Sequence, residues 1–186
     1  GAGSRVLEIG CGTGKLTELL AQRGLVVDAV DPGPGMIDVA RRRVGNNDAV
    51  RFHLGTFEEL TLPEHAFGAV FSATAFHWLD PNIAWCKVAS LLVPGGLVAL
   101  LMHVDVHDER TEDDDEAFRA LLRTYAPDVE PELPRTRDLT AILAGVDERR
   151  GNPSEVWDWL LGGRFNLANA DAARLFDDVE LQTVLL

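Results

Sequence analysis

The chain has 186 residues, of which 46 % are hydrophobic and 25 % charged, and its formal net charge is -13. This length and composition are typical of one globular α/β domain with a sizeable core, and they leave too little chain for two ordinary domains. The acidic balance argues against non-specific binding to DNA, RNA or an anionic membrane, because such binding depends on Lys and Arg.

The sequence shows neither a membrane anchor nor a disulfide framework. No apolar run is long enough to cross a bilayer, and the N-terminus lacks the basic and apolar regions of a signal peptide. Cys11 and Cys86 are the two cysteines. We therefore expect a cytoplasmic protein without disulfides.

A glycine turn joins the first predicted strand to the first predicted helix. Residues 6–9 are a short, mainly apolar run of the kind that a strand buried on both faces needs. Gly10, Gly12 and Gly14 follow and let the backbone turn sharply and approach a ligand closely. Helical spacing of leucines then predicts a helix over residues 15–24.

Two common nucleotide-binding loops do not fit this turn. The phosphate-binding loop needs Ser or Thr after Gly-Lys, but Leu16 follows Lys15, and Ile9 stands where its first glycine belongs. The dinucleotide fingerprint needs a last glycine where this chain has Lys15. A Rossmann-like turn that binds a nucleotide, or no ligand, stays as an alternative interpretation.

With Glu8 ahead of the glycines, the run Leu7-Glu8-Ile9-Gly10-Cys11-Gly12-Thr13-Gly14 resembles the first motif of the class I S-adenosylmethionine-dependent methyltransferases. It looks closest to the small-molecule enzymes related to the trans-aconitate and ubiquinone/menaquinone methyltransferases. The resemblance implies a Rossmann-like parallel sheet in a three-layer α/β/α sandwich, with S-adenosylmethionine as cofactor. The cofactor-binding residues that it implies here are Glu8, Gly10, Cys11, Gly12 and Gly14.

The second predicted strand, residues 25–30, ends at Asp31. An acid at this distance from a glycine turn is where the ribose hydroxyls of a nucleotide are held, and one carboxylate can accept from both hydroxyls. The alternative role of Asp31 is to cap the next helix. Asp28 suits the ribose less well because it falls in the middle of the strand.

The next two elements offer candidates for the adenine. Met36 opens a helix over about residues 35–44, and the resemblance places it against the adenine, with core packing as the alternative. The strand at residues 50–54 leads to Thr56, where the family usually has an acid that accepts from the adenine amino group. Phe57 either flanks the purine or packs beneath this loop.

The fourth predicted strand, residues 67–72, leads into a loop that should border the methyl donor, because ligands bind at the carboxyl ends of such strands. The resemblance implies cofactor contact at Ala75. His77 is the catalytic candidate, as a base, and a structural role is the alternative. Trp78 is expected to pack into the wall of the site.

A helix over residues 82–92, a turn at residues 93–96 and a strand at residues 97–102 complete the repeat. Strands and helices that alternate in this way predict a parallel sheet with right-handed crossovers. Residues 1–102 would then form the donor-binding core of a single methyltransferase domain.

Residues 103–178 are predicted to form a helical region on the acceptor side, followed by a sixth strand at residues 179–186. The acidic run 103–116 could be drawn as a metal site, but such runs usually lie in solvent at a helix start, and no metal is predicted. Short helices are expected at residues 117–125, 139–143, 156–161 and 170–176. Candidates for holding an acceptor carboxylate are Arg135, Arg137, Arg149, Arg150 and Arg164.

The sequence thus predicts an enzyme that transfers a methyl group from S-adenosylmethionine to a small molecule. The alternatives are a non-catalytic S-adenosylmethionine-binding or interaction protein of the same fold and, less favoured, a nucleotide-dependent oxidoreductase. The family's N-terminal helical cover and seventh strand are not readable, so we expect a fragment or a shortened relative. The acceptor and the oligomeric state are not predicted.

Overall fold

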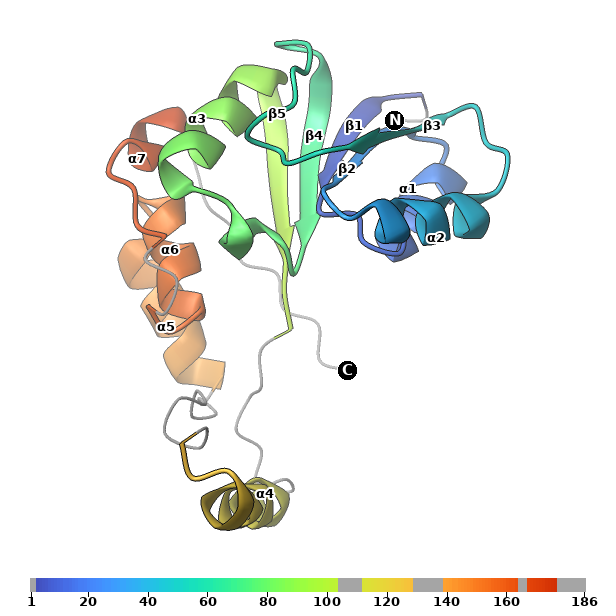
Figure 1. Ribbon diagram of the computed structural model, residues 1–186. Coiled ribbons are helices and arrows are strands. Elements are labelled where there is room, and N and C mark those ends of the chain that lie inside the picture. The colour runs from blue at the N-terminus through green and yellow to red at the C-terminus, as the bar shows by residue number, and fades with distance from the viewer. Residues whose placement is uncertain (1–2, 104–111, 129–138, 164–166, 177–186) are drawn as a thin grey trace. The chain divides into compact units, whose positions relative to one another are not determined.

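The computed structural model of the protein describes residues 3–103, 112–128, 139–163 and 167–176 (Figure 1). The chain divides into two compact units. The first, called the sheet unit below, comprises residues 1–103 and 169–177. The second, called the helical unit, comprises residues 104–168 and 178–186.

The sheet unit is built on five parallel strands (Figure 1). The strands are β1 (Arg5–Ile9), β2 (Val26–Asp31), β3 (Val50–Leu54), β4 (Phe67–Ala73) and β5 (Leu92–Leu101), in the order β3-β2-β1-β4-β5. The chain runs outward from β1 to β3 and then returns to the other side of β1 with β4. This reversal creates a switch point between β1 and β4, where open α/β sheets bind ligands beyond the carboxyl ends of the strands.

Helices flank this sheet, as predicted. They are α1 (Lys15–Gln22), α2 (Pro34–Val44), α3 (Pro81–Leu91) and α7 (Ala172–Leu175), with a short 3₁₀ helix η1 (Phe76–Trp78). One core cluster joins Leu20 of α1 and Ile37 of α2 to Val6, Val27 and Ala29 of the sheet. The parallel α/β fold with flanking helices is therefore confirmed.

Helix α3 is buried through Trp85, which connects two distant segments of the chain. The Trp85 ring lies 4.8 Å from the Phe76 ring and 5.8 Å from the Phe176 ring. The Asn169 side chain donates to the Pro81 carbonyl oxygen at 2.9 Å. Residues 169–176, which were predicted within the helical region, therefore pack on the sheet unit.

Strand β5 begins five residues earlier than predicted. Leu92 pairs with Phe67, and Leu97 pairs with Ala69, so the residues between them form an irregular bulge in the strand. The turn predicted at residues 93–96 is wrong, because these residues lie within β5, where the register against β4 shifts.

The helical unit contains α4 (Glu112–Tyr125), α5 (Leu139–Arg149) and α6 (Pro153–Leu160). Helix α5 is longer than predicted, and it packs closely on α6 because Gly145 leaves room for the Trp159 ring; a Cβ atom at position 145 would overlap the indole. Among the helices that the structure describes, none combines the length and the apolar character needed to cross a membrane. The predicted sixth strand and most of the acidic run lie outside the described residues.

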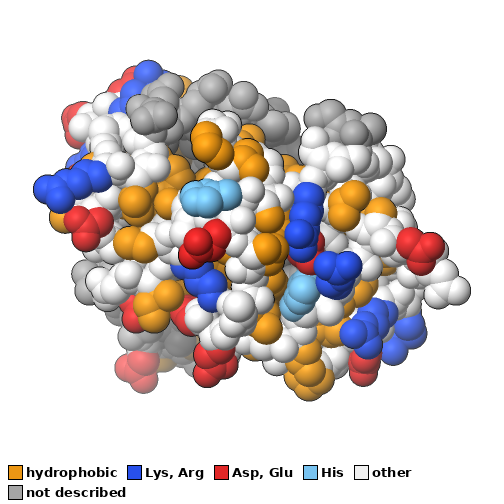
Figure 2. Space-filling view, turned by 90° about the horizontal axis from the view of Figure 1, so that it is seen from above, with side chains coloured by type: hydrophobic (Ala, Val, Ile, Leu, Met, Phe, Trp, Pro, Cys, Tyr) orange, Lys and Arg blue, Asp and Glu red, His pale blue; other side chains and the backbone are white. Residues whose placement is uncertain are grey.

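On the face that Figure 2 shows, described side chains of both charges are interspersed with hydrophobic ones. Within the described residues, no cluster of three or more His, Cys, Asp and Glu side chains could hold a metal ion. Part of the alternative metal site drawn from the acidic run lies outside these residues.

Candidate functional site

The glycine turn after β1 is closed on the neighbouring strand β2. The amides of Gly10 and Cys11 donate to the Val30 carbonyl oxygen at 2.8 and 3.0 Å. The amide of Gly12 donates to Asp31 Oδ2 at 2.8 Å. These three donors are used within the protein, so a ligand at this turn would meet other groups, among them the first-turn amides of α1, which no N-cap side chain covers.

Two glycines of the turn are required for different reasons. A Cβ atom on Gly10 would overlap the Cβ atom of Ala75, so Gly10 lets the loop after β4 approach the turn. Gly12 has a left-handed φ of 53°, and no atom lies within 4 Å of the position of its missing Cβ. Gly12 therefore faces open space, where a ligand has room to lie against the backbone.

Asp31 joins the glycine turn to the start of α2 and is 8 % exposed. Its Oδ2 accepts from the Gly12 amide and its Oδ1 from the Gly33 amide, both at 2.8 Å. Gly33 is itself the N-cap residue of α2, and no side chain caps that helix, so Asp31 does not act as its cap. Each carboxylate oxygen retains a second acceptor site. Asp31 can therefore accept from two neighbouring hydroxyls while it stays held by the protein.

Asp28, in the middle of β2, has a different environment. Its carboxylate accepts from Arg5 Nε at 2.7 Å and lies 2.7 Å from His53 Nε2. Burial alone would raise the pKa of Asp28, but the hydrogen bonds and charges of Arg5 and His53 outweigh burial and leave it below its usual value. Asp28 is thus paired with basic side chains of β1 and β3 within the sheet.

Glu8 is 2 % exposed and contacts the first helix. Thr17 of α1 donates its hydroxyl to Glu8 Oε2 at 2.5 Å. Burial raises the pKa of Glu8 to about 7; the Thr17 hydrogen bond opposes this shift, and the nearby Asp31 charge adds to it. Burial, together with the charges of Glu8 and Asp31, raises the pKa of the Cys11 thiol to about 12. Cys11 is therefore a neutral, buried part of the turn.

The candidates for the adenine side differ in exposure. The Met36 side chain at the start of α2 is 48 % exposed, which disfavours core packing as its role. Phe57 is 2 % exposed and packs beneath the loop after β3. Thr56 donates its hydroxyl to Glu59 at 2.9 Å, and its oxygen can still accept a hydrogen bond.

The loop after β4 carries the catalytic candidate. Thr74, at the end of the strand, has a φ of 54°, which is strained for a β-branched residue and is typical of functional sites. The ring of His77 in η1 lies 5.0 Å from the ring of Trp78. The expectation that Trp78 packs into a wall is wrong, because its side chain is 75 % exposed. Nothing in the sequence around it distinguishes a buried from an exposed tryptophan.

Two residues of the site region were missed by the sequence analysis. Thr17 is the partner of Glu8, and its place in the first turns of α1, beside the glycine motif, is a signal that could have indicated this contact. Lys87 of α3 donates to carbonyl oxygens of the loop after β3. Its position within a helix gave no sign of this contact.

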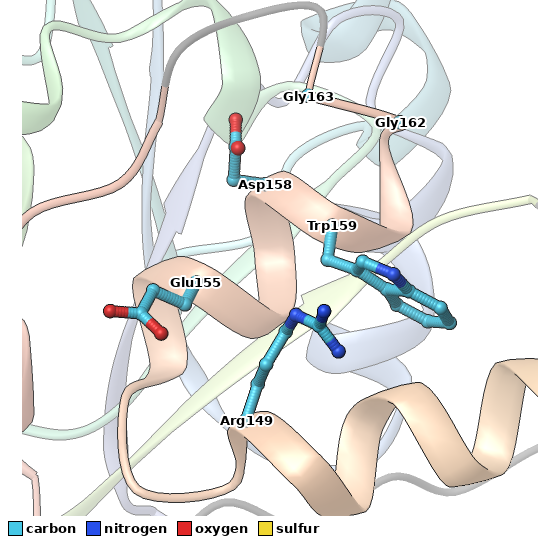
Figure 3. Close-up of a pocket in the computed structure, with 6 residues that line it drawn as sticks. All are labelled: Arg149, Glu155, Asp158, Trp159, Gly162 and Gly163. Atoms are coloured by element: carbon cyan, nitrogen blue, oxygen red, sulfur yellow. The ribbon is translucent and has the colours of Figure 1, made fainter.

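A cavity of about 470 Å³ lies in the helical unit (Figure 3). It is lined by Arg149, Glu155, Asp158, Trp159, Gly162 and Gly163. The Arg149 guanidinium stacks over the Trp159 ring at 5.2 Å and donates to the Gly145 carbonyl oxygen at 2.9 Å. The carboxylates of Glu155 and Asp158 point away from the Arg149 guanidinium (Figure 3). The Arg149 guanidinium thus already has partners within the helical unit. The negative charges of Glu155 and Asp158 in the lining disfavour a carboxylate ligand in this cavity.

The other arginines predicted to hold an acceptor carboxylate are not supported as its ligands. Arg150, just after the end of α5, lies 3.8 Å from Asp147 of that helix. Arg135, Arg137 and Arg164 lie outside the described residues. The acceptor side of the site is therefore not identified among the described arginines.

The switch point, the closed glycine turn and the acid at the end of β2 are the features of a Rossmann-like domain. Residues 7–100, about half of the chain, match the family described as Methyltransferase domain, and the chain belongs to this family. Its cofactor is S-adenosylmethionine, and the residues present fit this group: Asp31 can accept from a ribose diol, and Gly12 leaves open space beside it.

Three similar proteins illustrate the relationship. An uncharacterized methyltransferase of Mycobacterium tuberculosis (strain ATCC 25618 / H37Rv) is 47 % identical over 109 residues, which cover 59 % of this chain and 43 % of the relative. A malonyl-[acyl-carrier protein] O-methyltransferase of Serratia marcescens is 36 % identical over 97 residues, covering 52 % of this chain and 37 % of the relative. The structure of Haemonchus contortus Phospholethanolamine N-methyltransferase 2 in complex with phosphomonomethylethanolamine and S-adenosylhomocysteine has a TM-score of 0.53 at 26 % identity, covering 77 % of this chain and 32 % of that chain. The chain spans less than half the length of these proteins.

Proposed function

We propose that the protein transfers a methyl group from S-adenosylmethionine to a small-molecule acceptor, as in the subgroup that contains the trans-aconitate and ubiquinone/menaquinone methyltransferases. The proposal rests mainly on the placement of Asp31. Its carboxylate is held at the carboxyl end of β2, beside the open space at Gly12. This position suits a ribose diol. Residues 1–102 would form the donor-binding core of one methyltransferase domain.

Each residue around the turn has a proposed role. Asp31 holds the ribose, and Glu8, Gly10, Cys11, Gly12 and Gly14 surround the methionine end. Met36, Thr56 and Phe57 form the adenine side, where the exposed Met36 side chain can lie on the base while the buried Phe57 supports the loop. Ala75 lies beside the methyl group, because it already contacts the turn at Gly10.

The cofactor supplies a methyl group that its sulfonium already activates. The protein residues then need mainly to hold donor and acceptor in line, and positioning alone can supply about 7–11 kcal/mol of a barrier. Rigid anchoring of the turn by Asp31 and by the Val30 carbonyl oxygen serves this purpose. A protein base is needed only for an acceptor that must lose a proton.

The chain is expected to bind S-adenosylhomocysteine and not NAD, because Lys15 stands where the dinucleotide fingerprint needs its last glycine. Isothermal titration calorimetry with the two ligands measures this preference. Binding of NAD in preference to S-adenosylhomocysteine would overturn the proposal. Binding without turnover on a panel of carboxylic acids and phenols, chosen because several relatives are named as O-methyltransferases, would favour the non-catalytic alternative.

For His77 we propose a role in shaping the acceptor side. His77→Gln is expected to retain most of the turnover on whichever panel acceptor is methylated, and His77→Ala to lose more. Both variants should keep the Kd of S-adenosylhomocysteine within about twofold, because His77 follows β4, whereas Asp31 is the last residue of β2. If both variants lose turnover equally, and its dependence on pH disappears, His77 is instead a general base.

A further inference from the structure

We propose that Lys87 is a positioning residue for the donor: its ammonium group fixes the loop of residues 55–60 and so sets the side of the site that faces the adenine. The inference rests on the proposed function, because it takes S-adenosylmethionine as the ligand. The loop follows β3, and Lys87 lies on α3. No resemblance or motif in the sequence assigns a role to this lysine.

The contacts of Lys87 are concentrated on this one loop. Its Nζ donates to the carbonyl oxygens of Phe57 at 2.7 Å, Glu58 at 3.0 Å and Leu60 at 2.6 Å. A lysine ammonium has three N–H donors, so each donor has one carbonyl partner. The same Nζ lies 5.1 Å from the centre of the Phe57 ring, within the range of a cation–π contact. A single charge therefore holds both the backbone and the buried aromatic side chain.

The loop depends on this charge for its shape. The amides of Glu59 and Leu60 donate to the Thr56 carbonyl oxygen at 3.3 and 3.2 Å, which folds the backbone into a tight turn. Three carbonyl oxygens then face one point, where only a donor can satisfy them. At its other end, the Gly55 amide donates to the Asp31 carbonyl oxygen at 3.1 Å. The loop is thus fixed between Asp31 and Lys87.

A second contact connects this loop to the segment that carries His77. Glu58 Oε1 accepts from the Asp80 amide at 3.0 Å. Asp80 in turn caps α3 by accepting from the Asn82 amide at 2.9 Å. Helix α3 and its cap therefore hold the loop after β3 against the loop after β4. Removing the Lys87 charge should loosen the adenine side of the site first.

The test compares Lys87→Met with the control Arg42→Met, which removes an exposed positive charge from α2. Lys87→Met is expected to weaken the binding of S-adenosylhomocysteine by roughly tenfold, within the range typical of coupled sites. It should also reduce the preference for S-adenosylhomocysteine over S-inosylhomocysteine, which differs only in the base. Amide hydrogen exchange of residues 55–61 should become faster without ligand. Arg42→Met should change none of these quantities.

Rescue separates positioning from general damage to the fold. In Lys87→Ala, ethylammonium chloride is expected to restore much of the affinity, because it returns a cationic donor to the three carbonyl oxygens; sodium chloride at the same ionic strength should not. Lys87→Gln, which keeps two donors without the charge, provides a further variant whose folding is checked by circular dichroism. Affinity within twofold of wild type in every folded Lys87 variant would overturn the inference alone. A wild-type chain that binds no S-adenosylhomocysteine would overturn the proposed function and this inference with it.

Discussion

Asp31→Ala is expected to weaken S-adenosylhomocysteine binding by about a hundredfold while the sheet unit stays folded. A hydrogen bond to a charged group contributes roughly 1.5–3 kcal/mol, so the loss of an acceptor for two ribose hydroxyls costs about tenfold for each at the lower end. The substitution also frees the amides of Gly12 and Gly33, which Asp31 holds at 2.8 Å. The glycine turn must then be ordered when the ligand binds, which adds to the loss.

Calorimetry measures this affinity, and circular dichroism checks the fold. Asp38→Ala is the matched control, because Asp38 is an exposed acid on α2 in the same region of the chain. It should bind S-adenosylhomocysteine as wild type does. If Asp31→Ala also binds normally, Asp31 does not contact the donor, and the ribose is held elsewhere.

Glu8→Gln is expected to remove a large pH dependence of the free energy of unfolding. The pKa of Glu8 is raised from 4.5 to about 7, so between these values the folded chain holds a proton that the unfolded chain releases. This contribution to stability is complete below about pH 4.5 and is lost as the pH rises through 7. At 1.36 kcal/mol per pKa unit, the loss is about 3 kcal/mol.

Urea unfolding of both proteins between pH 4 and pH 9 measures the effect. Glutamine can still accept from Thr17, so Glu8→Gln should gain stability relative to wild type as the pH rises to 8. Asp28 acts in the opposite sense, because its lowered pKa gives stability that is lost at acid pH, but it is common to both proteins. The exposed Glu64→Gln is the control. Parallel stability curves for wild type and Glu8→Gln would show that Glu8 is not protonated in the folded chain.

Most of the sheet could be predicted because its signals are local. The strand at residues 50–54 was predicted with the bounds that β3 has, since a short run containing apolar residues ends at a glycine. The start of β5 could not be predicted in this way. Its turn residues indicate a break, and only the pairing of Leu92 with Phe67 shows that the strand begins before it. Pairing of this kind depends on tertiary structure.

In the candidate site, too, residues with a local sequence signal could be predicted, whereas contacts that depend on tertiary structure could not. Asp31 was placed at the edge of the sheet because the end of a strand is visible in sequence, and the structure adds its two amide partners. Lys87 was missed, because a lysine in a helix ordinarily reaches solvent, and its three carbonyl partners lie 27 to 30 residues earlier in the chain. The exposure of Trp78 was missed for a related reason, since no local pattern tells which elements cover a side chain.

The buried Asp28 has a consequence for how the sheet assembles. Strands β2 and β3 pair with Asp28 opposite Arg51 and Val30 opposite His53. Because side chains alternate between the faces of a strand, a slip of one residue would turn His53 away from Asp28 and leave a buried carboxylate short of a donor. Such a loss costs about 1–3 kcal/mol or more for a charged group. The contacts of Asp28 with Arg5 and His53 thus favour the native register of β2 and β3 over misaligned pairings during folding. The apolar residues of β2 would not provide this discrimination alone.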